Sequence, residues 1–328
     1  MQSISWGIIG CGDVTELKSG PAFNKVKDSR LAAVMRRDPE KARDYATRHK
    51  VPRWYSSAQD LIDDAEVNAV YIATPPSSHE EYTLAAIKAG KPVYVEKPMS
   101  VDAASANRMA IAAREKNVKL SVAHYRRAQP LFSQVKKFLA EGAIGKVRFV
   151  RCELYKPPLT REELQIPKTL WRLDPAIAGG GLFHDLSPHQ LDIMYHFFGE
   201  TERVCGIAVN QARAYNADDL VVGTILFKNG VVFNGLWCFA IATEDEKDHC
   251  EIFGEKGSIC FSFFEHKLVT LTVDGITRQF PFEPLQHVQQ PMIEKVVDYF
   301  LGRGPNPNSG EEGAAVMQII DTIAGHKL

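Results

Sequence analysis

Short apolar runs alternate with helix-like patterns over the first third of the chain. The runs that have the length of buried strands lie at residues 4–10, 30–35, 69–74, 91–97 and 119–125. The segments expected to form helices lie between them, at 39–49, 57–64, 79–90 and 102–117, the last three with clear helical spacing and polar faces. This alternation of strand and helix predicts a parallel sheet with helices on both faces.

The pattern changes after about residue 145. Strand-like segments then follow one another, at 146–155, 204–211, 220–227, 231–239, 250–254, 258–264, 268–273 and 276–282. Asn229-Gly230 and Asp274-Gly275 are strong hairpin turn signals, and Lys256-Gly257 is a weaker one. We expect an antiparallel sheet here, followed by helices near 286–301 and 311–324.

The predicted fold class is therefore α/β with two domains. Residues 1–123 should form a doubly wound parallel sheet of the Rossmann, dinucleotide-binding type. Residues 124–328 should form an α+β domain with a large, mostly antiparallel open sheet, closed by terminal helices at about 286–324. A length of 328 residues suits two domains of ordinary size.

Composition excludes several function classes. The net charge of −1 gives no broad basic surface for nucleic acid. The six cysteines contain no C-x-x-C pair, which argues against a disulfide framework or a structural zinc site. No apolar run approaches 18 residues, and the first residues look like a strand and not like a signal segment. We expect a cytoplasmic protein with reduced thiols and no membrane span.

A glycine loop follows the first predicted strand. Gly10-x-Gly12-x-x-Thr15, with Asp13 and Val14 inside it, would let the backbone approach a pyrophosphate at the start of a helix. Thr15 replaces the usual third Gly or Ala, so helix and strand are expected to pack slightly wider apart. A glycine turn without a ligand is the alternative, but the position after an N-terminal strand favours a dinucleotide.

The end of the second strand bears on the choice of dinucleotide. Sites for NAD usually place an acidic residue there, and sites for NADP place an arginine. Arg36 and Arg37 come first and Asp38 follows. Two guanidinium groups suit a 2′-phosphate, so we expect NADP(H). NAD stays possible if Asp38 turns to the ribose or if the arginines are only solvated.

Two charged residues stand at the mouth of the fourth predicted strand. Glu96, Lys97 and Pro98 follow the apolar segment 91–95, at the sheet edge where ligands of such folds bind. A partly desolvated lysine can donate a proton to a substrate oxygen or take one from it. An ordinary surface Lys–Glu pair is the alternative.

A second polar cluster occupies residues 179–199. Ser187 suits an N-cap and Pro188 the first helical position, while Gly199 suits a helix end. His189, Asp192 and His196 then share one helix face, with Asp185 just before the cap. The run Gly179–Gly181 removes side chains where the backbone would approach a ligand. His184 and these residues have zinc-binding chemistry, but they lack an H-E-x-x-H arrangement and a neighbouring cysteine.

Four motifs in order carry a family resemblance: GIIGCGDV, IATPPSSH, AGKPVYVEKPMS and GGGLFHDLSPHQLD. With the final NPNSGEEGAAVMQIIDTI, the chain resembles the Gfo/Idh/MocA oxidoreductases over nearly its whole length. The resemblance implies Lys97 as the catalytic lysine, Glu96 near the nicotinamide ribose and a cis bond before Pro98. It also implies that Thr74 and Pro75 pass the cofactor phosphates with His79 close by.

The same resemblance implies that Asp185 and His189 are an acid–base pair that works with the lysine and without a metal, so no metal is expected. His184 and His196 are then packing or capping residues. Softer candidates for substrate contact are Tyr125, Arg126 or Arg127, which lie where the domains join, and Trp171 and Arg172, since an indole face suits a sugar ring. A core aromatic beside a surface arginine is the equally open alternative.

The resulting hypothesis is an NADP(H)-dependent dehydrogenase or reductase for a secondary alcohol or ketone of a sugar, polyol or cyclitol. His189 is the better proton shuttle because histidine titrates nearest to neutral pH, Lys97 bonds the reacting oxygen, and Asp185 holds a neighbouring hydroxyl or orients His189. The alternatives are a glycosidase or lyase that only borrows the hydride, and a silent dinucleotide-binding regulator. The open sheet resembles those used for self-association in the family, which suggests a homodimer or homotetramer.

Overall fold

The computed structural model describes residues 2–265 and 267–325 and divides into two compact units. The first unit runs to Ala128 and includes Leu285–Met317, and the second comprises Gln129–Pro284 and the stretch that begins at Gln318. The sequence pattern predicts both terminal helices in the second domain, whereas residues 285–317 belong to the first unit. No helix among the described residues is long and apolar enough to cross a membrane.

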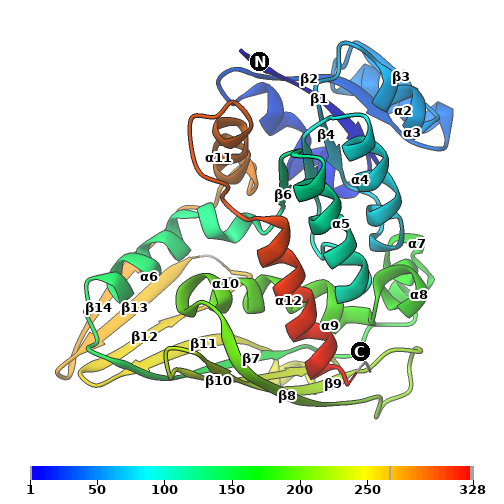
Figure 1. Ribbon diagram of the computed structural model, residues 1–328. Coiled ribbons are helices and arrows are strands. Elements are labelled where there is room, and N and C mark those ends of the chain that lie inside the picture. Colours follow the sequence, from blue (N-terminus) through cyan, green and yellow to red (C-terminus); the bar gives the residue numbers. More distant parts are fainter. Residues whose placement is uncertain (1, 266, 326–328) are drawn as a thin grey trace. The chain divides into compact units, whose positions relative to one another are not determined.

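A six-stranded parallel sheet forms the centre of the first unit (Figure 1). Its strands are β1 (Ile4–Ile9), β2 (Ser29–Met35), β3 (Arg53–Tyr55), β4 (Ala69–Ile72), β5 (Val93–Val95) and β6 (Leu120–Val122). They lie in the order β3-β2-β1-β4-β5-β6 with parallel pairing throughout. This is the strand order of the Rossmann fold, with the reversal of direction beside β1.

Helices cover both faces of this sheet. They are α1 (Asp13–Leu17), α2 (Pro39–Arg48), α3 (Ala58–Asp63), α4 (His79–Lys88), α5 (Ala103–Glu115) and α11 (Gln290–Phe300). On one face, Gly7 of β1 lies directly against Leu61 of α3. On the other, Trp6 of β1 lies in one core with the apolar side of α11, including Phe300 at 5.6 Å between ring centroids. The doubly wound arrangement expected from the pattern is confirmed.

The second unit is built on an eight-stranded, mostly antiparallel sheet. Its strands are β7 (Val147–Tyr155), β8 (Thr201–Val209), β9 (Leu220–Phe227), β10 (Val232–Cys238), β11 (Lys247–Gly254), β12 (Gly257–Phe261), β13 (Leu268–Val273) and β14 (Ile276–Pro281). The order is β14-β13-β12-β11-β7-β10-β9-β8, and the pairing of β7 with β10 is parallel. Hairpins join β9 to β10 at Asn229-Gly230 and β13 to β14 at Asp274-Gly275, as the turn signals predict.

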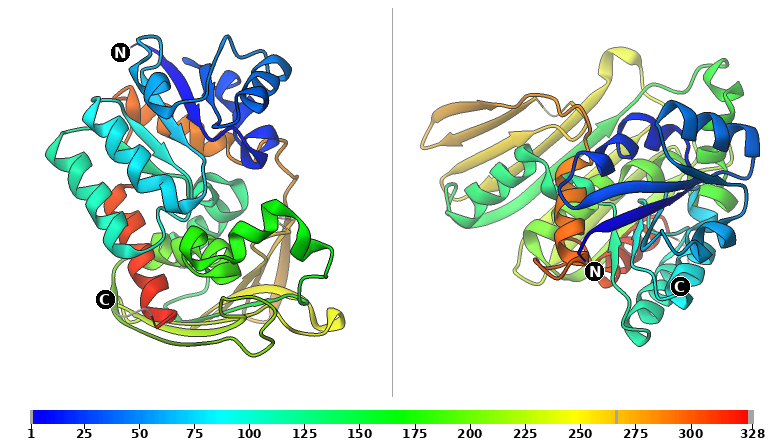
Figure 2. Two further views of the ribbon diagram at one scale, coloured as in Figure 1. Left: turned by 90° about the vertical axis from the view of Figure 1, so that its right-hand side faces the viewer. Right: turned by 90° about the horizontal axis from the view of Figure 1, so that it is seen from above.

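Helices lie on one face of this sheet. They are α6 (Pro130–Ala140), α7 (Pro167–Leu173), α8 (Pro175–Ala178), α9 (Gly181–Leu186) and α10 (Pro188–Phe198). Ile323, near the end of α12 (Gly310–Ile323), packs against Gly206 and Gly223 of the sheet. Figures 1 and 2 show α6, α9 and α10 over the same face, and the opposite face carries no helix of the described residues.

Several elements had no counterpart in the sequence prediction, among them β3, α6 and the short helices α7 to α9. Strand β3 is a three-residue edge strand whose side chains are largely exposed, so no apolar run marked it. Helix α6 buries Leu131, Phe132, Val135 and Phe138 at helical spacing behind Pro130 at its first turn. That spacing is present in the sequence, although our prediction contains no helix at residues 130–140.

Candidate functional site

The glycine loop leads from β1 into α1 and lies against the segment that follows the neighbouring strand β4. Gly10 has a φ of +94°, and a Cβ there would lie 2.7 Å from Thr74 Cγ2, so only glycine fits between β1 and the segment after β4. Gly12 begins α1 without a side-chain cap, and a Cβ on it would meet nothing closer than the Gly10 carbonyl oxygen at 3.9 Å. The backbone is therefore open beside Gly12, with exposed Asp13 and half-buried Val14 next to it.

Thr15 fits into this loop through its own hydrogen bond. The side chain is fully buried and its hydroxyl donates to the Gly12 carbonyl oxygen at 2.8 Å. Tyr45 of α2 donates its hydroxyl to the Thr15 carbonyl oxygen at 2.8 Å. The departure from glycine at this position is thus accommodated by local hydrogen bonds to backbone carbonyls.

The three charged residues after β2 have different surroundings. Arg36 Nη1 donates to the Cys11 carbonyl oxygen at 3.3 Å, so this guanidinium contacts the glycine loop. Asp38 caps α2, since its carboxylate accepts from the backbone N–H groups of Glu40 and Lys41 at 3.1 Å each. These bonds lower the pKa of Asp38, that from Lys41 most. Arg37 is exposed and lines a hollow.

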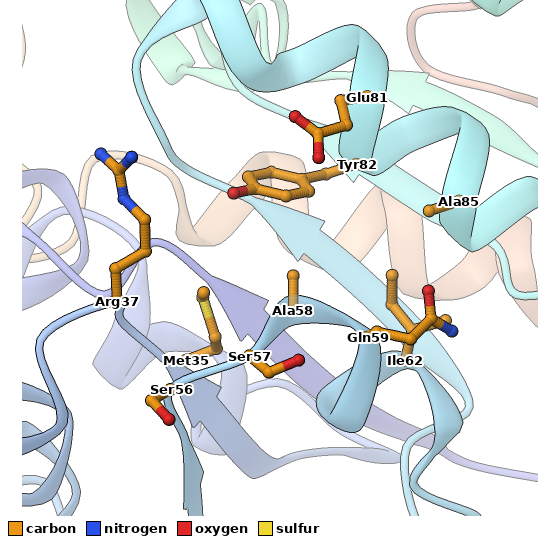
Figure 3. Close-up of a pocket in the computed structure, with 10 residues that line it drawn as sticks. All are labelled: Met35, Arg37, Ser56, Ser57, Ala58, Gln59, Ile62, Glu81, Tyr82 and Ala85. Atoms are coloured by element: carbon orange, nitrogen blue, oxygen red, sulfur yellow. The ribbon is translucent and has the colours of Figure 1, made fainter.

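That hollow lies beyond the end of β2 and measures about 320 Å³. Figure 3 shows Tyr82 and Glu81 of α4 on one side and Ser57 and Ala58 at the start of α3 on the other. Its lining also includes Met35, Ser56, Gln59, Ile62 and Ala85. In a Rossmann fold the ribose next to adenine binds at this strand end. The sequence predicts Arg37 but not the serines, because β3, which ends just before Ser56, carries no apolar run that would mark it. Tyr82 lies on the predicted helix 79–90, but nothing in its neighbourhood singles it out.

Glu96 is a buried carboxylate at the end of β5, with a side chain that is bonded from several directions. Its Oε1 accepts from the Tyr71 hydroxyl at 2.5 Å and from Gln289 Nε2 at 2.6 Å, and its Oε2 accepts from the Lys97 backbone N–H at 3.0 Å. Burial raises the pKa of Tyr71 well above its usual value, and Glu96 adds to the shift. Tyr71 therefore stays a neutral donor.

The segment after Lys97 is tied to the segment after β4 through His79. The Lys97–Pro98 bond is cis, as the resemblance implied. His79 is fully buried, with Nε2 2.7 Å from the Thr74 carbonyl oxygen and Nδ1 3.0 Å from that of Pro98. Burial is the main cause that lowers the pKa of His79. His79 thus packs inside the protein, and the hydroxyl of Ser78 donates to Thr74 Oγ1 at 2.9 Å.

In the second unit, the glycine run is filled by the protein itself. A Cβ on Gly180 would lie 2.0 Å from Nδ1 of His184, and one on Gly181 would lie 2.5 Å from the Ala217 Cβ. His184 is buried beside Phe183, which in turn meets Trp237 edge-on at 5.0 Å. At these two glycines the missing side chains make room for packing around α9, not for the ligand that we had expected.

Asp185, at the exposed side of α9, belongs to a small cluster with two candidates for substrate contact. Its Oδ2 lies 3.4 Å from Nε of Arg172, and the Arg172 guanidinium stacks 4.5 Å from the ring centroid of Trp171. Side chains of Asp185 and Arg172 are 20% and 31% exposed. This group offers a carboxylate, a cation and an indole face together.

Helix α10 begins with Pro188 in its first turn and ends before Gly199, as predicted. His189 is 6% exposed and its ring lies 5.8 Å from that of Phe264. His196 lies 2.8 Å from the ammonium of Lys136 on α6. The predicted capping role of the Ser187 side chain is wrong. Ser187 has helical backbone angles where α9 runs into α10, it is fully buried, and its side chain makes no capping hydrogen bond.

The segment after β6 is buried, contrary to a surface role. Tyr125 joins the core with α11, and Arg126 is 3% exposed with its guanidinium 5.6 Å from the Tyr125 ring. Arg127 Nη1 pairs with Glu312 Oε1 at 2.8 Å. These contacts lie within the first unit, and a substrate contact of Tyr125 or Arg126 stays a prediction. Among the described residues, no group of three or more His, Cys, Asp or Glu side chains could hold a metal ion.

Two family models match most of the chain. Residues 4–124 match the oxidoreductase family with an NAD-binding Rossmann fold, and residues 132–260 match the GFO/IDH/MocA C-terminal domain. The chain belongs to the Gfo/Idh/MocA oxidoreductase family. The Gfo/Idh/MocA relatives are named oxidoreductases, reductases and dehydrogenases, which places this chain among the NAD(P)-dependent enzymes of that kind.

Individual relatives cover between 77% and 99% of the chain. Oxidoreductase P35 of Formosa agariphila is 48% identical over 324 residues, 98% of each chain. The 1,5-anhydro-D-fructose reductase of Ensifer adhaerens is 29% identical over 77% of this chain and 74% of its own. The solved structure of levoglucosan dehydrogenase in complex with NADH has a similar fold, with a TM-score of 0.87 and 23% identity over 99% of this chain and 96% of its own.

Proposed function

We propose that this protein is an NADP(H)-dependent oxidoreductase that acts on a secondary alcohol or ketone of a sugar, polyol or cyclitol. The observation that carries the proposal is the placement of Lys97 at the carboxyl end of β5, next to a buried Glu96. The open glycine loop and the hollow beside Arg37 belong to the same unit. A dinucleotide bound along this sheet edge would meet all three features.

The residues present fit a dinucleotide. The free space beside Gly12 suits a pyrophosphate, and the hollow lined by Arg37, Ser57 and Tyr82 suits an adenosine moiety. When bound, the nicotinamide would exchange a hydride with a substrate carbon. The protein itself contributes orientation and proton transfer.

The surroundings of the arginines support NADP(H). The Asp38 carboxylate caps α2 and forms a 3.3 Å ion pair with Lys41. Because these contacts already use the carboxylate, Asp38 is a weak candidate for the bond to a ribose 2′-hydroxyl that is typical of NAD sites. Arg37 lines the hollow and has the fork geometry that binds a phosphate. In Arg37→Ala, kcat/KM for NADP+ should fall by about tenfold to 200-fold, the loss of one phosphate contact of about 1.5–3 kcal/mol, while that for NAD+ changes little. An equal loss with both cofactors would contradict the preference.

Acid–base chemistry is assigned to Lys97, His189 and Asp185. We infer that Lys97 bonds the reacting oxygen and that His189 takes the hydroxyl proton in oxidation and returns it in reduction. Asp185, already paired with Arg172 beside Trp171, would hold a neighbouring hydroxyl group. This assignment rests on the family motifs and on the chemistry of each side chain in its own unit.

The substrate class follows from relatives. The 1,5-anhydro-D-fructose reductase, the levoglucosan dehydrogenase and the aldose-aldose oxidoreductase of Caulobacter crescentus all carry carbohydrates in their names. The indole of Trp171 beside Arg172 would suit a sugar ring in this chain as well.

The deciding experiment is a panel of sugars, polyols and cyclitols with NADP+ and NAD+, and of the matching ketones with NADPH and NADH. We expect one class to change nicotinamide absorbance, and Lys97→Met to slow that change by roughly 10²- to 10⁴-fold while binding of the cofactor persists. Product formation with no net absorbance change, from a tightly retained cofactor, would instead indicate hydride borrowing. Unchanged turnover in Lys97→Met would overturn the assignment.

Self-association through the uncovered sheet face is a further part of this proposal. Ile207 is 68% exposed opposite Val222, which is 39% exposed, and Phe149 stacks on Phe253 at 4.5 Å on the same face. Such an apolar sheet face suits a homodimer or homotetramer. Ile207→Glu should lower the molar mass measured by light scattering, whereas an oligomer that persists in this variant and in Val222→Glu would contradict this interface.

A further inference from the structure

His79 joins two loops that the sheet does not join. The pairing of β4 with β5 ends at Ile72 and Val95, followed by a bond from the Glu96 N–H to the Ile72 carbonyl oxygen at 2.9 Å. Beyond that point, the chain continues as the Thr74 segment on one side and as the Lys97–Met99 segment on the other. His79 reaches both, through the Thr74 carbonyl oxygen on Nε2 and those of Pro98 and Met99, at 3.0 and 3.3 Å, on Nδ1.

The chemistry of these contacts is unusual because every partner is an acceptor. A neutral imidazole has one N–H, so only one of the two loops can receive a full hydrogen bond from it at a time. Replacing the ring by a group without donors would leave buried carbonyl oxygens without this partner. His79 is fully buried at the first residue of α4, so water cannot readily take its place.

We propose that His79 is a positioning residue that fixes the Lys97 loop against the Thr74 loop through their backbone carbonyls. The inference rests on the proposed function, in which Lys97 acts on the substrate, and on the family resemblance, which implies that the Thr74 segment passes the cofactor phosphates. The His79 side chain reaches both loops through their backbone carbonyl oxygens. It sets where the lysine stands relative to the cofactor's path, and a displacement of about 1 Å at such a site can cost roughly 10²-fold in rate.

Three variants separate this role from general stability. His79→Phe keeps a flat ring without donors, and His79→Gln keeps an amide that can donate to one loop. His287→Gln is the matched control, since His287 is another buried histidine of the first unit, with Nδ1 2.6 Å from the Leu17 carbonyl oxygen. Hydrogen exchange by mass spectrometry is followed in the peptides that cover residues 73–78 and 95–101.

The expected result is faster exchange in both peptides for His79→Phe, with a smaller increase for His79→Gln. His287→Gln should leave both peptides unchanged even where it lowers Tm by a similar amount. Exchange in His79→Phe equal to that of the control would overturn the proposed link, whatever the enzyme's substrate proves to be.

Turnover tests the functional consequence with the substrate that the panel identifies. In His79→Phe, kcat should fall by about 10- to 100-fold, while KM for that substrate changes less than about threefold, because binding groups stay in place. His79→Gln should recover part of kcat, and His287→Gln should keep it. A kcat in His79→Phe like that of the wild type would overturn the positioning role, although an active wild type would leave the proposed oxidoreductase function intact.

Discussion

The two units hold their functional side chains in different ways. In the first unit, Lys97 stands on a loop, and buried polar groups from distant parts of the chain brace that loop: Tyr71, His79 and Gln289. In the second, Asp185 and His189 stand on short helices that apolar side chains and glycines fit against a sheet. A helix satisfies its own backbone, so packing suffices to place it, whereas a loop needs external donors.

The largest effects should come from the reacting groups themselves, and they should be alike in both units. Lys97→Met and His189→Asn are each expected to lower kcat/KM by roughly 10²- to 10⁴-fold, the usual contribution of one acid–base group. Because the two groups serve one step, the double variant should lose far less than the product of the two factors. Steady-state kinetics of the four proteins measure this. Full multiplication would show that the two act in separate steps.

Glycines should distinguish the units next. In Gly180→Ala, a Cβ would lie 2.0 Å from the buried ring of His184, so the free energy of unfolding should fall by about 1–3 kcal/mol or more. In Gly12→Ala, the Cβ has open space, so stability should hold while cofactor affinity drops about tenfold, or ~1.4 kcal/mol. Denaturant titration and cofactor titration check the pair. A stable Gly180→Ala protein would contradict the tight packing around α9.

Two buried glutamines offer a finer comparison. Gln289 donates to the Glu96 carboxylate, and Gln190 of α10 accepts from the Trp237 indole at 2.7 Å. Both are fully buried. Gln289→Leu weakens the hydrogen bonding of a buried acidic group, so unfolding free energy should fall by about 1.5–3 kcal/mol, against about 1 kcal/mol for Gln190→Leu. Urea unfolding curves decide the order. The reverse order would mean that polar bracing matters less in the first unit than packing does in the second.

The smallest effect is expected for an exposed ion pair of the first unit. Glu16 bonds Arg48 at 2.8 Å and His49 at 2.7 Å, and these contacts, that with Arg48 first, lower its pKa to about 2. A depressed pKa stabilises the fold above the unfolded value of about 4.5, and this contribution is lost as pH falls toward 2. Glu16→Gln should therefore cost less than about 1 kcal/mol at pH 7, and the cost should shrink as pH falls toward 2 and disappear below it. A cost that grows on acidification would contradict the sign.

Parts of the fold and of the site could be predicted because their signals are local. The apolar strands and the turn at Asn229-Gly230 are marked by neighbouring residues. The capping role of Asp38 is also marked locally, since Asp-Pro-Glu is typical of a helix start. The same residue follows the second strand, where an acidic side chain can also bind a ribose. The bond between Gln289 and Glu96 spans 193 positions, and nothing near either residue announces it. The ring of His184 likewise fills the space beside Gly180. The sequence spacing of these two residues does not show that the ring turns toward the glycine.

The return of residues 285–317 to the first unit has a consequence for biosynthesis. A nascent polypeptide that has just emerged as far as Ala128 possesses all six parallel strands but lacks the helix that covers Trp6 and the amide that meets Glu96. The ribosome must therefore finish translating the whole intervening sheet before the amino-terminal half can attain its native state. Until then, the aromatic surface around Trp6 stays exposed to solvent. Exposed apolar surface of this kind favours aggregation and chaperone binding during synthesis.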